Sequence, residues 1–262
     1  MEAVSRDGVR LWWDASGFGA TVLLVPGRGD SRDLYPRRFT ETLVKSGCRV
    51  IWFDPRDTGL SGDGGSTYTL SDMADDARTV LDAADVSAAH LVGLSMGGLL
   101  LVDLATRAPH RVLSMTLLSA ASPDPEAGIG EDFFDLMDDD PIGTIIRAMG
   151  PTTDEDQAWV TREIADAARR APPRPEAGQR HQDAAYRSTW PTKEQLSDVA
   201  APCLVIHGSA DRKLPLRHGE AFRDGIPTSE LVVVDGMGHL PRPAEWDVIA
   251  ERVAQHIARN AA

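Results

Sequence analysis

The chain has 262 residues, of which 42% are hydrophobic and 26% are charged, and its formal net charge is −13. This composition predicts an ordinary globular protein with one substantial core. The acidic balance, with no Lys/Arg run to offset it, argues against nucleic acid or an anionic membrane as a partner. No apolar run reaches the ~18 residues of a membrane span, and the first residues lack the apolar core of a signal peptide, so we expect a cytoplasmic protein.

The two cysteines, Cys48 and Cys203, each lie in an apolar, strand-like segment. Two lone cysteines without the spacing of metal ligands indicate buried thiols rather than a disulfide or a zinc site. We expect no metal and no other cofactor.

Residues 1–121 alternate between strand and helix patterns. A hairpin turns at Asp7-Gly8, and an apolar strand over 21–25 ends in the turn cluster Pro26-Gly27-Arg28-Gly29-Asp30. The later elements are a helix over 34–46, a strand over 49–53, a helix capped by Thr69 or Ser71, the strand and helix of 88–105, and a strand over 112–119. Such alternation predicts an α/β fold with right-handed crossovers and a mostly parallel sheet.

From Ser122 to about Ser197 the strand patterns stop, and the chain becomes acidic, Pro-rich and helical. We interpret this segment as a helical cap inserted after the sixth strand, with helices over 131–137, 142–149 and 154–170. A linker is excluded because the segment keeps large apolar residues to bury, namely Phe133, Phe134, Leu136, Ile145, Ile146, Trp159, Ile164 and Trp190. The expected division is a core of residues 1–121 and 198–262 with a cap of residues 122–197.

Strand patterns resume at 203–207 and 231–234. A final helix carries Trp246, Ile249, Val253 and Ile257 on one face and closes the core domain.

The segment Gly93-Leu94-Ser95-Met96-Gly97 matches G-x-S-x-G, the turn that presents a nucleophilic serine between a strand and a helix. Glycines are needed because the two backbones approach closely at a strained turn. The serine then stands at a helix N-terminus, where backbone N–H groups favour developing negative charge. The alternative is an inert serine in an ordinary turn, and the presence of catalytic partners decides between the two.

A serine hydroxyl needs a base to take its proton and a carboxylate to orient that base. Asp211 follows one of the late strands, and His239 lies in the loop after the last strand. The order Ser, Asp, His is that of α/β-hydrolases, and the carboxyl ends of parallel strands share one edge of the sheet. We therefore predict that Ser95, Asp211 and His239 form a catalytic triad.

Over nearly its whole length the chain resembles α/β-hydrolase fold serine hydrolases. Besides the serine turn of residues 93–97, called the nucleophile elbow, the resemblance rests on residues 25–29, 54–61, 207–211 and 236–239. The Arg56-Asp57-Thr58-Gly59 loop, the elbow and the Gly236-Met237-Gly238-His239 ending are most similar to the aclacinomycin methylesterase group, whose members cleave a methyl ester on a polyketide. The cap shows little similarity to that group.

The resemblance implies a role for each triad residue. Ser95 would attack the carbonyl carbon, His239 would accept and return the proton, and Asp211 would fix the tautomer of His239.

The resemblance also implies an oxyanion hole made by the backbone N–H groups of Met96 and Arg28. Gly27, Arg28 and Met96 would line the substrate site. The loop has Pro26-Gly27 where the family commonly has His-Gly, which still leaves a backbone donor. The Arg28 side chain could bring a cation near a carboxylate-bearing substrate or lie in solvent.

Two other acids compete with Asp211. Asp124 follows the strand after the nucleophile helix, but Pro123 and Pro125 indicate a cap entrance there. Asp235 lies four residues before His239 and is typical of a turn at a strand end.

The remaining polar candidates are assigned structural roles. We expect His207 to be buried and hydrogen-bonded, and Asp54, Arg56 and Asp57 to brace loops near the site. His181, His218 and His256 lie in polar or helical settings that indicate surface positions.

The expected function is that of a cofactor-independent serine hydrolase that cleaves a carboxylic ester of a small, apolar molecule through an acyl-enzyme. A methyl ester is the first expectation, and a lactonase, another C–C or C–O hydrolase, or a cofactor-free perhydrolase or haloperoxidase would use the same triad. A ligand receptor, a cyclase or a decarboxylase would be a non-hydrolytic use of the scaffold.

Overall fold

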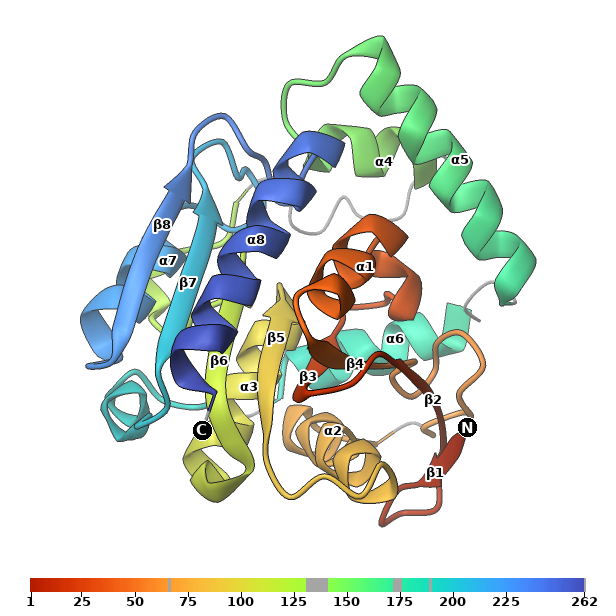
Figure 1. Cartoon of the computed structure of the whole chain (residues 1–262), viewed down its shortest axis with the longest axis vertical. Coiled ribbons are helices and arrows are strands. Elements are labelled where there is room, and N and C mark those ends of the chain that lie inside the picture. Colours follow the sequence, from red (N-terminus) through yellow and green to blue (C-terminus); the bar gives the residue numbers. More distant parts are fainter. Residues whose placement is uncertain (66, 131–140, 172–175, 189, 262) are drawn as a thin grey trace.

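The computed structural model describes residues 1–65, 67–130, 141–171, 176–188 and 190–261. Its centre is an eight-stranded sheet in the order β1-β2-β4-β3-β5-β6-β7-β8 (Figure 1). The strands are β1 (Glu2–Val4), β2 (Arg10–Ser16), β3 (Ala20–Val25), β4 (Cys48–Phe53), β5 (Ala89–Leu94), β6 (Val112–Leu118), β7 (Cys203–Gly208) and β8 (Ser229–Val234). Only the β1–β2 and β2–β4 pairs are antiparallel within this sheet, so the predicted mostly parallel α/β architecture is confirmed.

Helices cover both faces of the sheet (Figure 1). One face packs against α1 (Arg37–Lys45) and α8 (Pro243–Asn260), where the rings of Phe39 and Trp246 lie 5.3 Å apart in an edge-on arrangement. The other face packs against α2 (Leu70–Ala83), α3 (Met96–Arg107) and α7 (Arg217–Gly225). The central strands are therefore buried on both sides, which explains their continuous apolar runs.

Capping residues fix where the helices begin. The Thr69 hydroxyl accepts the Asp72 N–H at 3.2 Å, and the Asp72 carboxylate accepts the Thr69 N–H at 2.8 Å, so Thr69 rather than Ser71 caps α2. The helix predicted from residue 34 begins at Arg37 instead. Residues 32–34 form a separate 3₁₀ turn, and Pro36 precedes the first α-helical turn.

The segment between β6 and β7 is helical where it is described. It contains α4 (Pro141–Ala148), α5 (Asp154–Arg170) and α6 (Glu176–Tyr186). The bounds of α5 match the prediction, because Thr153 forms a capping box with Asp156. The helix predicted over 131–137 lies outside the described residues.

Two helices, α6 and α7, are absent from the sequence-based prediction. The buried positions of α6 are Gly178, Gln182, Ala185 and Tyr186, a set in which one residue is a glycine and another is polar. Such a face lacks the apolar periodicity by which an amphipathic helix is recognised.

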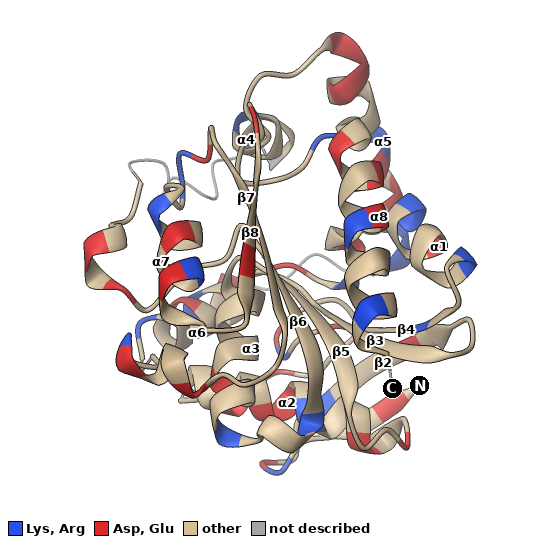
Figure 2. Ribbon diagram, turned by 60° about the vertical axis from the view of Figure 1, so that its left-hand side comes forward, with Lys and Arg blue, Asp and Glu red and all other residues tan. Residues whose placement is uncertain are grey.

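Charged residues of both signs are spread over the outer helices (Figure 2). Acidic residues gather on the first turn of α5, where Asp154, Glu155 and Asp156 interact favourably with the helix dipole. Among the described helices, none combines the length and apolar character needed to cross a membrane.

Candidate active site

Ser95 occupies a sharp turn between β5 and α3. Its backbone has φ +56° and ψ −121°, a conformation that residues other than glycine rarely adopt. A Cβ atom on Gly93 would lie 2.6 Å from the Gly97 carbonyl carbon, and one on Gly97 would lie 2.3 Å from the Val25 carbonyl oxygen. Both glycines are therefore required by the close approach of strand and helix.

The structure brings Ser95, His239 and Asp211 into one hydrogen-bonded chain. Ser95 Oγ lies 3.0 Å from His239 Nε2, and His239 Nδ1 lies 2.8 Å from Asp211 Oδ2. The three residues follow β5, β8 and β7, whose carboxyl ends meet at one edge of the sheet. Because the carboxylate accepts the proton on Nδ1, Nε2 is left to accept a proton from Ser95 Oγ.

The Asp211 carboxylate is held from two sides. Its Oδ1 accepts the backbone N–H groups of Lys213 and Leu214, each at 2.9 Å. Burial by itself raises the pKa of Asp211, but the charge and hydrogen bond of His239 and the nearby His207 imidazole outweigh it, so the pKa lies well below its usual range. The Asp211 carboxylate is therefore ionised at neutral pH.

The competing acids have other partners. Asp124 forms an ion pair with Lys193 at 2.7 Å, and Asp235 accepts a hydrogen bond from Ser209 Oγ at 3.0 Å. It is Asp211 that the structure places beside His239.

The loop after β3 lies directly against Ser95. A Cβ atom on Gly27 would lie 3.4 Å from Ser95 Cβ, and Arg28 is the next residue along this loop. On the other side, Met96 opens α3, where the first backbone N–H groups have no acceptor within the helix. This arrangement supports the prediction that the Arg28 and Met96 amides form an oxyanion hole.

The Arg28 side chain has a role that the sequence did not indicate. Its Nη1 lies 2.5 Å from Asp183 Oδ1 on α6, its guanidinium carbon lies 5.8 Å from the Tyr186 ring centroid, and the side chain is 13% exposed. The expectation of a solvated loop arginine is therefore wrong, because the side chain is largely buried and forms an ion pair with the cap. Because α6 was not predicted, this pairing could not be foreseen.

Two of the three histidines expected at the surface are buried. His218 on α7 is 3% exposed; its Nδ1 accepts the Ser122 N–H at 3.0 Å and its Nε2 donates to the Gly128 carbonyl at 2.6 Å. Burial lowers the pKa of His218 to about 4 and also lowers the pKa of His256, which is 4% exposed. The surface prediction fails because both lie on the inner faces of their helices.

His207 and His181 also lie near polar groups of the core. His207 is fully buried and donates from Nε2 to the Leu214 carbonyl at 2.8 Å, as expected of a structural histidine. His181 on α6 is partly buried, and its Nδ1 lies 3.5 Å from Asp57 Oδ2. His181 is thus also misplaced by the surface prediction.

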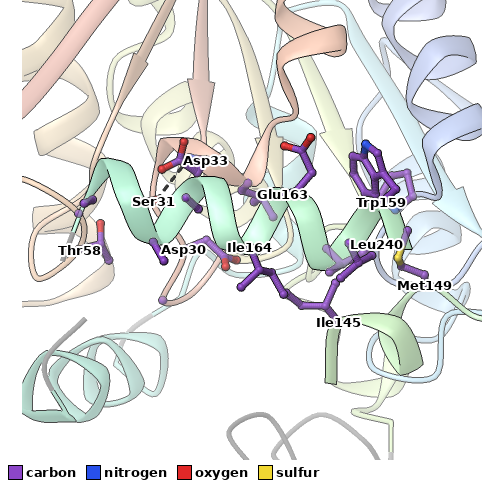
Figure 3. A pocket seen from close by; sticks show the side chains of 18 of the residues that line it. Asp30, Ser31, Asp33, Thr58, Ile145, Met149, Trp159, Glu163, Ile164 and Leu240 are labelled. Carbon is purple, nitrogen blue, oxygen red and sulfur yellow. Dashed lines mark hydrogen bonds between the residues drawn. The ribbon is translucent and has the colours of Figure 1, made fainter. Parts of the chain in front are cut away.

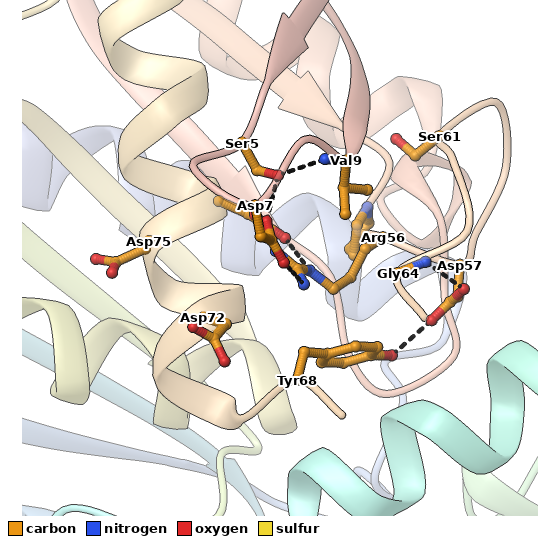
Figure 4. Close-up of polar contacts among 12 residues, drawn as sticks. Ser5, Asp7, Val9, Arg56, Asp57, Ser61, Gly64, Tyr68, Asp72 and Asp75 are labelled. Carbon is orange, nitrogen blue, oxygen red and sulfur yellow. Dashed lines mark hydrogen bonds and ion pairs between the residues drawn. The ribbon is translucent and has the colours of Figure 1, made fainter. Parts of the chain in front are cut away.

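The polar residues after β4 brace their loop, as predicted (Figure 4). Asp54 accepts the Arg32 and Leu60 N–H groups at 3.0 and 2.8 Å. Arg56 is ion-paired with Asp76 and Asp7, and its guanidinium carbon lies 4.8 Å from the Tyr68 ring centroid.

Asp57 is held by two donors, accepting the Gly64 N–H and the Tyr68 hydroxyl at 2.8 Å each. Asp57, Asp63 and His181 are the one group of the described residues whose donor atoms lie close enough together, within 4.8 Å, to hold a metal ion. Much of the Asp57 acceptor capacity is already used by those two donors, and the Asp63 side chain is 80% exposed.

A cavity of about 410 Å³ lies between α5 and the core (Figure 3). Gly29, which follows Arg28, and Leu240, which follows His239, both line it. Figure 3 shows Ile145, Ile164 and Leu240 gathered beside α5, and these apolar side chains are only partly buried. Ser95 and His239 are not among the described residues in its wall, so this cavity does not enclose the two side chains.

A second cavity of about 600 Å³ is bordered by His239 itself. Its wall is more polar and includes Thr144, Arg147, Arg212 and Lys213. Of these two cavities, the polar one therefore has His239 in its wall, whereas none of Ser95, Asp211 and His239 lines the apolar one.

Comparisons with known proteins agree with this geometry. Rhodomycin D methylesterase DauP of Streptomyces sp. (strain C5) is 29% identical over 97% of this chain and 96% of that protein, and its counterpart DnrP of Streptomyces peucetius is 28% identical over the same shares. These alignments cover the core and also the cap. The cap is the part in which the sequence motifs showed little similarity. The solved esterase EaEST of Exiguobacterium antarcticum superposes with a TM-score of 0.84 at 20% identity, covering 98% of this chain and 99% of that one.

The family model for the alpha/beta hydrolase fold matches residues 20–241. This span runs from β3 to the residues just after His239 and includes the elbow. The chain therefore belongs to the alpha/beta hydrolase fold family.

Proposed function

We propose that this protein hydrolyses a carboxylic ester of a small, largely apolar molecule through an acyl-enzyme formed on Ser95. The observation that carries the proposal is the hydrogen-bonded chain from Ser95 through His239 to Asp211, with lengths of 3.0 and 2.8 Å. A serine, a base within reach of it and an ionised acid behind the base are the parts that acyl transfer requires.

In the first half of the reaction, Ser95 Oγ attacks the ester carbonyl carbon as His239 Nε2 takes the hydroxyl proton. The negative charge that develops on the carbonyl oxygen is met by the backbone N–H groups of Arg28 and Met96. The C–O bond to the alcohol then breaks, and His239 returns the proton to the departing alcohol.

In the second half, a water molecule takes the place of the alcohol. His239 accepts a proton from the water as its oxygen attacks the acyl carbon, and collapse of the intermediate releases the carboxylic acid and restores the Ser95 hydroxyl. Asp211 holds the imidazole and stabilises its protonated form in both halves.

The cavity under the cap supports an apolar substrate. Its wall contains Ile145, Met149, Trp159, Val160, Ile164 and Leu240. A methyl ester of a polyketide-like ring system is the specific substrate class we propose, because the alignments with the two rhodomycin D methylesterases cover 97% of this chain. In this proposal, residues 122–197 act as the cap that selects the substrate.

Turnover of p-nitrophenyl acetate and labelling by a fluorophosphonate test the reaction. The wild type is expected to show a burst of p-nitrophenol and to take up one label, while Ser95→Ala shows neither. A wild type that gives no burst and no label would refute the proposal. Rates on the methyl ester, the ethyl ester and a lactone of related aromatic acids then test the methyl ester preference. A monochlorodimedone bromination assay tests for haloperoxidase activity.

A further inference from the structure

The cap helix α6 reaches the loop that carries Arg28. Gln182, which is fully buried, accepts the Gly29 N–H through Oε1 at 2.6 Å and donates from Nε2 to the Arg56 carbonyl at 2.8 Å. One side-chain amide thus joins the loop after β3 to the loop after β4. The next residue on the helix, Asp183, is the partner of the Arg28 guanidinium.

The loop needs such a clamp because of its own composition. Arg28 stands between Gly27 and Gly29, and glycine restricts the backbone less than any other residue. Gly29 has φ +78°, in the left-handed region. Without outside contacts, the direction of the Arg28 N–H would vary with these two flexible neighbours.

Both ends of Arg28 are fixed by α6. The Gln182 amide holds the peptide that follows Arg28, and Asp183 holds its side chain. Together these contacts restrict rotation about the Arg28 backbone, and hence the direction of the N–H that we assign to the oxyanion hole. An oxyanion donor is effective only when it is aimed before the charge develops.

We propose that Gln182 is a positioning residue for the oxyanion hole, acting through the Gly29 N–H, and that the cap thereby sets the geometry of the reaction as well as the shape of the substrate cavity. This inference rests on the proposed ester hydrolysis at Ser95. Gln182 does not touch the reacting atoms; it holds the loop that does.

The test is Gln182→Met, which keeps the length of the side chain and removes both hydrogen bonds. We expect kcat to fall by about 10- to 100-fold, part of the 10²–10³-fold loss seen when an oxyanion donor is deleted outright. KM should change little, because the planar ester carries no developed charge. The inhibition constant of phenylboronic acid, whose adduct with Ser95 is tetrahedral, should rise by the factor by which kcat/KM falls.

Two further variants separate positioning from packing. Gln182→Glu keeps an acceptor for the Gly29 N–H and should retain more of kcat than Gln182→Met. Gln179→Met makes the same change about one turn earlier on α6 and should match the wild type. If Gln182→Met does not fold, Asp183→Asn, which weakens the hold on the Arg28 side chain, should still lower kcat and boronate affinity together.

Opposite results are distinguishable. If Gln182→Met has wild-type kcat, or if kcat falls while the affinity for phenylboronic acid is unchanged, Gln182 is a packing residue and the positioning role is wrong. If the wild type itself fails to hydrolyse esters or to label with fluorophosphonate, the proposed function is wrong, whatever Gln182 does.

Discussion

Arg56 and Asp76 form an ion pair that is almost completely buried, with Nε 2.7 Å from Oδ2 and the two side chains 1% and 2% exposed. Asp7 contacts the same guanidinium at 2.9 Å, but its side chain is 50% exposed. Burial raises the pKa of Asp76 to about 6 against the pull of Arg56, whereas a hydrogen bond from Arg56 lowers the pKa of Asp7 to about 2. One cation thus serves two carboxylates in very different surroundings.

Removing each partner should therefore have unequal effects. Asp76→Ala leaves a buried guanidinium without its best partner and should lower the free energy of unfolding by about 3–5 kcal/mol. Asp7→Ala removes a half-exposed partner and should cost less than about 1 kcal/mol. Urea unfolding of the two variants measures the difference, and equal losses would show that burial does not govern this network.

The choice of catalytic acid can be tested with a matched set of substitutions. Asp211→Asn keeps the shape of the side chain but reverses the hydrogen bond to His239 Nδ1, so kcat should fall by about 10⁴-fold. Asp124→Asn and Asp235→Asn, whose carboxylates bind Lys193 and Ser209, should stay within about twofold of the wild type. Loss of activity in Asp124→Asn alone would overturn the assignment.

Adding even a single methyl group to an elbow glycine should lower both stability and activity. A Cβ on Gly97 would lie 2.3 Å from a backbone oxygen, so Gly97→Ala should destabilise the protein by about 1–3 kcal/mol and reduce kcat. Gly62→Ala is the control, because its Cβ would meet nothing closer than 3.5 Å. Thermal unfolding and p-nitrophenyl acetate turnover measure both effects, and equal behaviour of the two variants would contradict the close approach of strand and helix at Gly97.

The apolar cavity can be narrowed from the cap. Ala167 on α5 lines it, so Ala167→Phe should lower kcat/KM for a bulky ester such as methyl 1-naphthoate by at least about tenfold. Turnover of p-nitrophenyl acetate should hardly change, because its acetyl group is small. Ala165→Phe places the same ring on the exposed side of the helix and should match the wild type. A parallel loss on both esters would mean that the cavity does not hold the substrate.

Because His218 is buried, we expect the free energy of unfolding to fall at acidic pH. Its folded pKa of about 4 lies below the ordinary value of 6.5, so the unfolded chain binds an extra proton between these two pH values. Its contribution to stability is complete above about pH 6.5 and is lost as the pH falls towards 4, by about 3 kcal/mol in total. His218→Asn, which cannot bind that proton, should show a shallower fall in the free energy of unfolding over this range. An identical slope in both proteins would assign the effect to other groups.

Most of the candidate site could be predicted from the sequence, because its residues lie directly after strands. An apolar strand followed by a glycine-flanked serine has few structural solutions, and the same holds for Asp211 and His239 in the loops after β7 and β8. The bounds of α5 were equally readable, since Thr153 and Asp156 form a local capping signal that needs no tertiary information.

What escaped prediction depends on contacts between distant segments. Gln182 and Asp183 contact residues more than 150 positions earlier, and nothing in the sequence of α6 indicates which of its polar residues face inward. His218 looked like a surface residue for the same reason: its partners, Ser122 and Gly128, belong to a chain segment that reaches it only in the folded protein.

The backbone at Ser95 carries a consequence for the protein as a whole. With φ at +56°, any L-residue at this position holds strain on the order of 1–3 kcal/mol, and glycine would relieve it. The residue that folding alone would favour here is therefore glycine, which lacks the hydroxyl group that the proposed reaction requires. Replacing Ser95 with glycine would raise stability and remove the proposed activity. A screen for heat resistance alone would therefore favour inactive variants at this position.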